Sequence, residues 1–217
     1  MTATSYVAEQ DFKRLNPVTV PSTSSFGPVG TRTFFAGDVI YRRGDKAMKI
    51  YRIDTGAVRV YRVSPSGCRN ILAFHSAGEW FGLEASGHHE DYAEAICETR
   101  LRPFSTSGSM PLPVSLLDLC LRNLSFAYVR QSLIVRPTAV ARVAGFIEEE
   151  ACKSAGGGPE FELLMSRADI ADYLGLTVES VARAFTRLSS RRIIRLDGRL
   201  HRRVRILDPS RLIVASL

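Results

Sequence analysis

Two charged residues in the C-terminal third of the chain have the chemistry needed to read base pairs. Glu179 and Arg183 are one helical turn apart, so on a helix they lie on the same face. A guanidinium donates paired hydrogen bonds to O6 and N7 of guanine, and a carboxylate accepts from the amino group of cytosine. Arg187, Arg191 and Arg192 lie nearer the end of the same segment, where they are better placed for phosphates. The pattern predicts a DNA-reading helix.

The residues around this pair are typical of a helix-turn-helix followed by a wing. Ser166 with Asp169 three residues later predicts a capping box, Gly175 predicts the turn, and Thr177 predicts the cap of the second helix. The expected core positions are Ala171, Gly175 and Val181, and the expected buried stripe of the second helix is Val178, Val181, Phe185 and Leu188. Two β-type runs at 193–196 and 200–206 flank an Asp-Gly pair, which predicts a hairpin. For the two helices, the alternative to a helix-turn-helix is a simple helical hairpin without a DNA-binding role.

Charge is placed unevenly along the chain. Its 217 residues carry a formal charge of +7, of which residues 151–217 supply +5 from 12 basic and 7 acidic side chains. Between Arg183 and Arg211 there are ten arginines and only two acids. A cluster of this kind concentrates positive potential at one end of the molecule and suits phosphate backbones, although a solvated basic surface is the plainer interpretation.

The N-terminal half has a different pattern. Residues 1–30 are rich in Ser, Thr and Pro and read as a flexible arm, with one short helix around Asp11–Leu15. From Thr33 to about Phe104, short alternating runs are separated by glycine turns, which predicts an antiparallel β-barrel or jelly roll. The four cysteines, at 68, 97, 120 and 152, are not at zinc spacing and are expected to be reduced, semi-buried thiols.

A long helix is predicted to connect the two parts. It has no Gly or Pro between Val114 and Arg136, and it carries a heptad stripe made of Leu117, Leu121, Leu124, Tyr128, Gln131 and Val135. This narrow stripe favours a parallel dimer seam over packing within one chain. Pro137 cannot continue the helix, and Thr138 predicts the start of a second one over about 139–152, so a hinge is expected at 136–138.

These elements predict an α+β chain in four parts. They are a flexible arm (1–30), a β-barrel sensor-like domain (31–112), a dimerisation helix (113–136) and a winged-helix DNA-binding domain (137–217). The sequence has neither a run of ~18 uncharged apolar residues nor a basic-then-apolar N-terminus. We therefore expect a cytoplasmic protein without a membrane partner.

From about residue 30 to its C-terminus the chain resembles the Crp–FNR family of bacterial transcription regulators. The most specific matches are at 81–95 and 174–183, and both are similar to the FNR and FixK branch. The resemblance implies an N-terminal β jelly roll of the cyclic-nucleotide-binding type, a dimerisation helix and a C-terminal winged helix. It also implies a non-enzymatic homodimer, an activator in most cases, with double-stranded DNA and RNA polymerase as partners.

The resemblance also assigns roles to residues. The positions that read a TTGA half-site fall on Glu179, Ala182 and Arg183, so the expected target is a TTGA-N6-TCAA-like palindrome. Ala182 departs from the usual Ser and offers a methyl group in place of a hydroxyl. Val178 stands where many cyclic-AMP-responsive members have Arg, which also favours TTGA. The residues expected at the DNA backbone are Ser166, Thr177, Ser180, Thr186, Arg187, Arg191, Arg192 and Arg202.

No cofactor is expected in the β-domain. FNR holds an iron–sulfur cluster through four cysteines, but residues 1–67 contain none, and none falls at the position of the fourth ligand. Cyclic-AMP-binding members hold the phosphate through Arg-Ser, but residues 91–95 read Asp-Tyr-Ala-Glu-Ala and no Arg lies between Arg69 and Arg100. The FixK-like pattern implies a cofactor-independent regulator of micro-oxic respiration, denitrification or nitrogen-fixation genes. A regulator gated by a cyclic nucleotide or another small ligand is the alternative.

Three histidines on the predicted barrel, His75, His88 and His89, raise a more distant alternative, a cupin-like metal site. Adjacent histidines on a strand point to opposite faces, and no carboxylate is spaced to support them. We expect exposed loop histidines and no metal.

Overall fold

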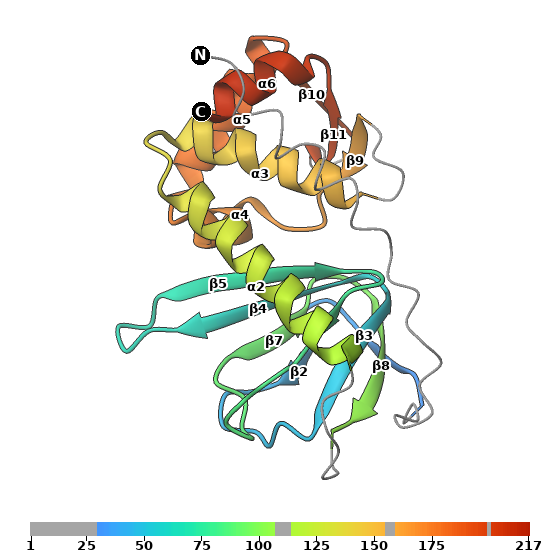
Figure 1. Cartoon of the computed structure of the whole chain (residues 1–217). Coiled ribbons are helices and arrows are strands. Elements are labelled where there is room, and N and C mark those ends of the chain that lie inside the picture. The colour runs from blue at the N-terminus through green and yellow to red at the C-terminus, as the bar shows by residue number, and fades with distance from the viewer. Residues whose placement is uncertain (1–29, 107–113, 155–158, 199–200) are drawn as a thin grey trace.

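The computed structural model describes residues 30–106, 114–154, 159–198 and 201–217, so the arm at 1–29 and its short helix are outside the described residues. The described chain forms a β-domain and a C-terminal domain, and a long helix, α2 (Val114–Ile134), runs from one to the other (Figure 1). Within the described residues, no helix is both long and apolar enough to cross a membrane.

The β-domain consists of two antiparallel sheets, as the alternating runs predict. One sheet has the order β1-β8-β3-β6, with β1 (Arg32–Phe34), β8 (Thr99–Ser105), β3 (Lys49–Thr55) and β6 (Trp80–Phe81). The other has the order β2-β7-β4-β5, with β2 (Val39–Tyr41), β7 (Tyr92–Ala95), β4 (Ala57–Val63) and β5 (Arg69–Ser76). Chain neighbours such as β1 and β2 lie in different sheets, which is the crossing pattern of a jelly roll.

Two of the three histidines are buried, so the expectation that all three are exposed is wrong. His89 stacks on Tyr41 with ring centroids 3.6 Å apart, and its Nδ1 lies 3.4 Å from the Glu84 carboxylate. His75 lies 3.6 Å from a Glu79 oxygen. Strand alternation cannot reveal such pairs, because the partners come from turns and from other strands. His88 is exposed.

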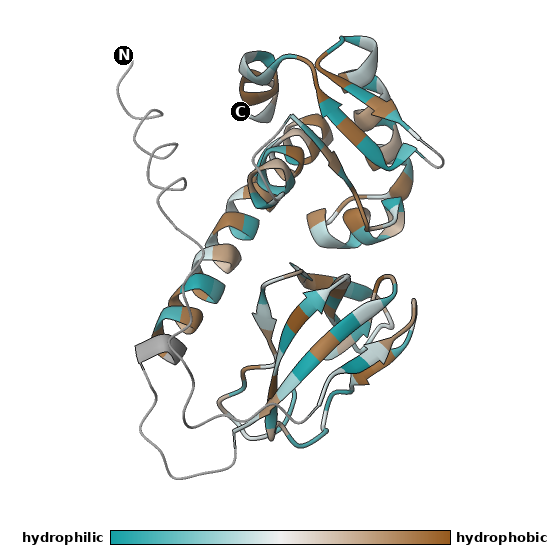
Figure 2. Ribbon diagram, turned by 90° about the vertical axis from the view of Figure 1, so that its right-hand side faces the viewer, coloured by the Kyte–Doolittle hydropathy of each residue, from teal (hydrophilic) through white to brown (hydrophobic). Residues whose placement is uncertain are grey.

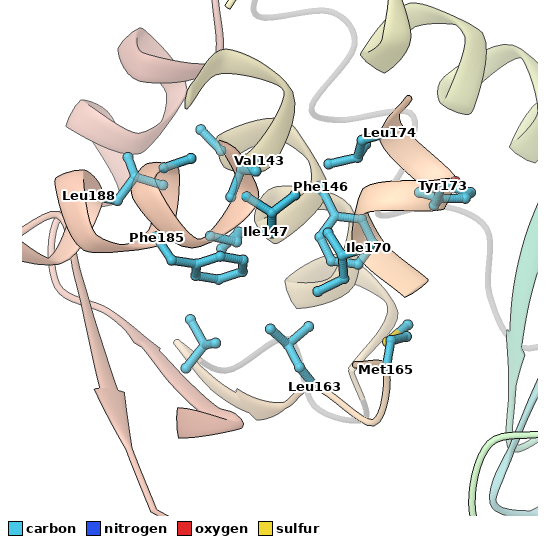
Figure 3. Close-up of a cluster of buried hydrophobic side chains, with 14 of the residues drawn as sticks. Val143, Phe146, Ile147, Leu163, Met165, Ile170, Tyr173, Leu174, Phe185 and Leu188 are labelled. Atoms are coloured by element: carbon cyan, nitrogen blue, oxygen red, sulfur yellow. The ribbon is translucent and has the colours of Figure 1, made fainter. Parts of the chain in front are cut away.

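The C-terminal domain follows the non-helical residues 135–138, where α2 ends at Ile134, two residues before the expected end of the helix. Thr138 caps α3 (Ala139–Lys153), as predicted, by accepting from the Ala141 N–H. Then follow β9 (Glu160–Glu162), α4 (Arg167–Leu174), α5 (Val178–Ser190), β10 (Ile194–Asp197), β11 (Arg203–Ile206) and α6 (Pro209–Ser216). Figure 3 shows α3, α4 and α5 converging on one apolar core built around Phe146, Ile170 and Phe185.

Some parts of this domain differ from the expectation. A hairpin forms as predicted, but its second strand begins at Arg203 and not at 200, and Asp197 pairs with Arg203, so Asp197 and Gly198 do not form a two-residue turn. In addition, β9 joins the hairpin as a third strand, and a short terminal helix, α6, packs against α3. Val178 is 44 % exposed, so its assignment to the buried stripe is wrong: it starts α5, and burial begins one turn later at Val181. The cysteines are also more exposed than expected, because only Cys97 is half-buried.

A cluster of acids lies where α3 approaches the β-domain. Lys153 lies 2.6 Å from Glu149 and 3.3 Å from Glu150, and it also approaches the ring of Phe126 on α2. Burial raises the pKa of Glu150 to about 7. The positive charge of Lys153 opposes this increase, and the negative charges of Glu149 and Glu79 add to it. Since this raised pKa belongs to the folded state, the stabilisation that Glu150 gives below pH ~4.5 is lost as the pH rises through ~7.

We therefore expect Glu150→Gln to change the pH dependence of stability. At pH ~5 the variant and the parent should have similar free energies of unfolding, and at pH ~8 the variant should be more stable by ~1–3 kcal/mol, since each pKa unit is worth ~1.4 kcal/mol. Urea denaturation at both pH values measures this, and Glu162→Gln, at an exposed carboxylate, is the control. An equal offset at both pH values would show that Glu150 is ionised throughout.

Candidate nucleic-acid interface

The helix-turn-helix is built by the caps that the sequence predicts. The Ser166 hydroxyl accepts from the Asp169 N–H, and the Asp169 carboxylate accepts from the Ser166 N–H at 3.1 Å, which completes the capping box. Gly175 ends α4 with φ +63°, a conformation that favours glycine. Thr177 then caps α5 by accepting from the Ser180 N–H at 3.2 Å. These three features fix both ends of α4 and the start of α5.

The two faces of α5 differ sharply. Val181, Ala184, Phe185 and Leu188 are buried against the rest of the domain. The opposite face is exposed and carries Glu179, Ala182, Arg183, Thr186 and Arg187. The structure therefore brings the three predicted base-reading residues together on one open surface.

The charges on this face match the predicted roles. Hydrogen bonds from its own backbone N–H and from Thr177 lower the pKa of Glu179, with a further contribution from Arg183. Glu179 is therefore ionised at neutral pH and acts only as a hydrogen-bond acceptor. The exposed guanidinium of Arg183 one turn later is a donor, so the pair offers opposite hydrogen-bonding characters to adjacent base pairs.

The predicted backbone contacts fall into two groups. Thr177, Thr186, Arg187, Arg191 and Arg192 are exposed on α5 or at its ends, with Ser180 half-buried beside Thr177. Ser166 and Arg202 instead line a cavity of ≈ 270 Å³ that faces the β-domain, together with Arg59, Arg69 and Asp169. The structure does not bring these two residues onto the exposed face of α5.

Other arginines of the basic cluster have structural partners. Arg195 pairs with Asp197 at 2.8 Å, and Arg205 pairs with Glu160 of β9 at 2.5 Å. Arg203 approaches the same Glu160 at 3.7 Å. Asp197 and Glu160 therefore neutralise part of the positive charge of the wing. The unpaired basic surface is smaller than the count of ten arginines implies.

Arg167, to which the sequence pattern assigns no role, anchors the start of α4. Its guanidinium lies 3.6 Å from the centroid of the Phe185 ring and donates to the His201 carbonyl at 3.1 Å. Burial, with repulsion from Arg202, lowers the pKa of Arg167 to about 10. This side chain joins α4 to α5 and to the wing. Its position directly after the cap could have signalled a role at the helix start, but nothing local pointed to Phe185.

Both domains of the chain match known protein families. Residues 141–214 match the Crp-like helix-turn-helix domain, and residues 31–106 match the cyclic nucleotide-binding domain. The nitrogen fixation regulation protein FixK of Rhizobium meliloti is 42% identical over 186 residues, which cover 86% of this chain and 87% of that protein. The chain belongs to the Crp/FNR family. Within it, the chain is FixK-like.

Other members of the Crp/FNR family agree. The fumarate and nitrate reduction regulatory protein of Escherichia coli is 32% identical over 178 residues, covering 75% of this chain and 70% of that protein. The solved structure of FixK2 from Bradyrhizobium japonicum superposes with a TM-score of 0.80 and 33% identity, over 87% of this chain and 97% of that one. The resemblance and the fold class expected from the sequence are confirmed: the chain is a DNA-binding transcription regulator, and regulators of this family are not enzymes.

The residues of the β-domain do not fit a cyclic nucleotide, although the domain family takes its name from one. The segment at 81–95 supplies Glu84, Glu90, Asp91 and Glu94 and no arginine. Burial raises the pKa of Tyr41, and the negative charges of Glu84 and Asp91 raise it further. These two carboxylates therefore place negative charge close to the buried Tyr41 side chain. Two arginines lie beside this segment, and both are bound to its acids: Arg62 to Asp91 at 2.7 Å, and Arg59 to Glu94. A phosphate would meet acids where it needs a guanidinium.

Metal ligands do not gather either. Within the described ranges, no three His, Cys, Asp or Glu side chains form a group able to hold a metal ion. His75 and His89 instead pack on aromatic rings, His75 on Phe81 and His89 on Tyr41.

Proposed function

We propose that the protein is a homodimeric transcription activator that reads TTGA-N6-TCAA-like palindromes without a cofactor. The observation that carries this proposal is the exposed stripe on α2. Leu117, Leu121, Leu124 and Tyr128 on α2, and Val135 directly after it, are between 48% and 73% exposed, and Gln131 is exposed as well.

The stripe is one of two apolar sides of α2. Leu133, on the other side, is 2% exposed and belongs to the core of its own chain, and Phe126, one heptad earlier, approaches Lys153. Figure 2 shows α2 as a long helix beside the β-domain, with apolar and polar residues alternating along its length. A second copy of α2 would cover this stripe, and two copies of α5 would then face two half-sites.

The target genes are proposed from the relatives. One relative is a nitrogen fixation regulation protein and another a fumarate and nitrate reduction regulatory protein. We infer control of micro-oxic respiration, denitrification or nitrogen-fixation genes, by a dimer that contacts RNA polymerase in the cytoplasm. Mapping of bound sites across the genome, followed by transcription from those promoters with purified polymerase, tests this part.

The purified protein is expected to bind its palindrome as isolated. Because the segment at 81–95 offers a phosphate four acids and no arginine, cyclic AMP should change the Kd by less than about twofold, since a ligand without differential affinity for the two states does not shift the equilibrium between them. Fluorescence anisotropy on the palindrome and on a scrambled duplex, with and without cyclic AMP or a chelator, measures this. Binding that appears only after cyclic AMP addition or iron–sulfur reconstitution would establish the effector-gated alternative.

A further inference from the structure

An ionic network joins the β-domain to the first helix of the helix-turn-helix. Arg69 on β5 binds Asp169 and Asp172 of α4, both at 2.8 Å. Arg59 on β4 binds Asp169 at 3.2 Å and is held from behind by Glu94 of β7. The Asp169 side chain is 4% exposed, whereas Arg69 and Asp172 are 29% and 31% exposed, so the pairs made by Asp169 are the buried part of the network. Breaking a buried pair of this kind leaves an uncompensated charge and is costly.

Asp169 has a second role, because its carboxylate also completes the capping box with Ser166. The residue that fixes the start of α4 is therefore the same residue that the two β-domain arginines hold. A rotation of the DNA-binding domain about the hinge would break the arginine contacts while leaving the cap intact. The network thus ties the orientation of the whole helix pair to the β-domain.

Apolar and mixed contacts surround the network. The Phe74 ring of β5 lies 5.0 Å from the Tyr173 ring of α4. The guanidinium of Arg130 on α2 lies 5.2 Å from the centroid of the Tyr173 ring and donates to the Asn70 side chain at 2.8 Å. Figure 2 shows α4 lying directly over the β-domain. The helix is therefore held by β4, β5 and α2 together.

The contact leaves the DNA-reading face free. The two carboxylates that the C-terminal domain contributes, Asp169 and Asp172, lie on α4, whereas Glu179 and Arg183 on α5 remain exposed. The docked arrangement is thus compatible with reading base pairs, and it differs from an inhibitory contact, which would cover them.

We propose that Arg59 and Arg69 are positioning residues that set the spacing between the two reading helices of the dimer, and so select the length of the spacer between half-sites. The inference rests on the proposed function. Adding or removing one base pair moves a half-site by ~3.4 Å along the DNA and rotates it by ~35°. Helices fixed by the network cannot follow this change, whereas helices attached only through the hinge can.

The test uses three duplexes with identical half-sites, one with the six-base spacer, one a base pair shorter and one a base pair longer. For the full-length protein we expect a clear preference for the six-base spacer. In Arg59→Gln/Arg69→Gln, the ratio of Kd values between the wrong and right spacers should fall about tenfold, which corresponds to ~1.4 kcal/mol. Selectivity for TTGA over a mismatched half-site should stay unchanged.

Two further variants separate positioning from folding. Arg102→Gln breaks an ion pair with Asp54 inside the β-domain and should keep the parent ratio. Arg69→Asp should lower the ratio, and Arg69→Asp/Asp172→Arg should restore part of it, which general destabilisation would not do. An unchanged ratio in the Arg59/Arg69 variant, or tighter binding to the six-base site, would overturn the inference. If the parent protein bound a palindrome no more tightly than a single half-site, this result would instead overturn the proposed function.

Discussion

Leu121→Asp is expected to turn the dimer into a monomer and to lower the affinity for the palindrome at least ~100-fold, since a linked second half-site contributes a factor of this order. Leu121 is 54% exposed in the single chain and is one of the leucines of the α2 stripe. Burying a leucine contributes ~1.5–3 kcal/mol, and two-fold symmetry applies the substitution twice. An aspartate facing its own copy adds repulsion between like charges.

The control for this prediction is Val214→Asp. Val214 on α6 is 70% exposed, so the substitution places the same charge on an apolar surface away from the stripe. Sedimentation velocity across a micromolar range, with and without the palindrome, measures the assembly. Leu121→Asp sedimenting as a dimer would mean that the chains meet through another surface, whereas a monomeric Val214→Asp would show that α6 takes part.

The features that the sequence could predict are those that depend on residues close to one another along the chain. The capping box of Ser166 and Asp169, the turn at Gly175 and the hairpin of β10 and β11 each involve residues within a few positions of one another. Such contacts depend on residue type and local backbone geometry, so they can be read from a short segment. The exposed face of α5 follows in the same way from helical periodicity.

Contacts between distant segments could not be predicted. Arg59 and Asp169 are 110 positions apart, and Arg69 and Asp169 are 100 apart. No pattern near Arg59 distinguishes it from other strand arginines such as Arg62, which pairs within the β-domain. The burial of His75 and the pairing of β9 with β11 also depend on how the chain returns on itself. The positioning network therefore became visible only in the fold.

Arg183→Ala is expected to weaken binding to the palindrome by ~1–3 kcal/mol per half-site and to flatten the preference at the guanine of TTGA. Arg183 is exposed on α5, one turn from Glu179 and opposite the buried Val181 and Phe185. Because a bidentate guanidinium contact specifies guanine, its loss should affect the specific site far more than random DNA. The variant should fold normally, since the side chain lies outside the core.

The companion variants separate base reading from backbone contact. Glu179→Ala should relax selection at the neighbouring base pairs, because an ionised carboxylate in the groove repels base acceptors as well as accepting from cytosine. Arg191→Ala should instead weaken all sequences alike and lower the slope of log K against log salt by roughly one, the value for one phosphate contact. Titrations on matched, mismatched and random duplexes at several salt concentrations distinguish these effects. If Arg183→Ala lost the same affinity on specific and random DNA, Arg183 would be a phosphate contact, and a different face of α5 would lie in the groove.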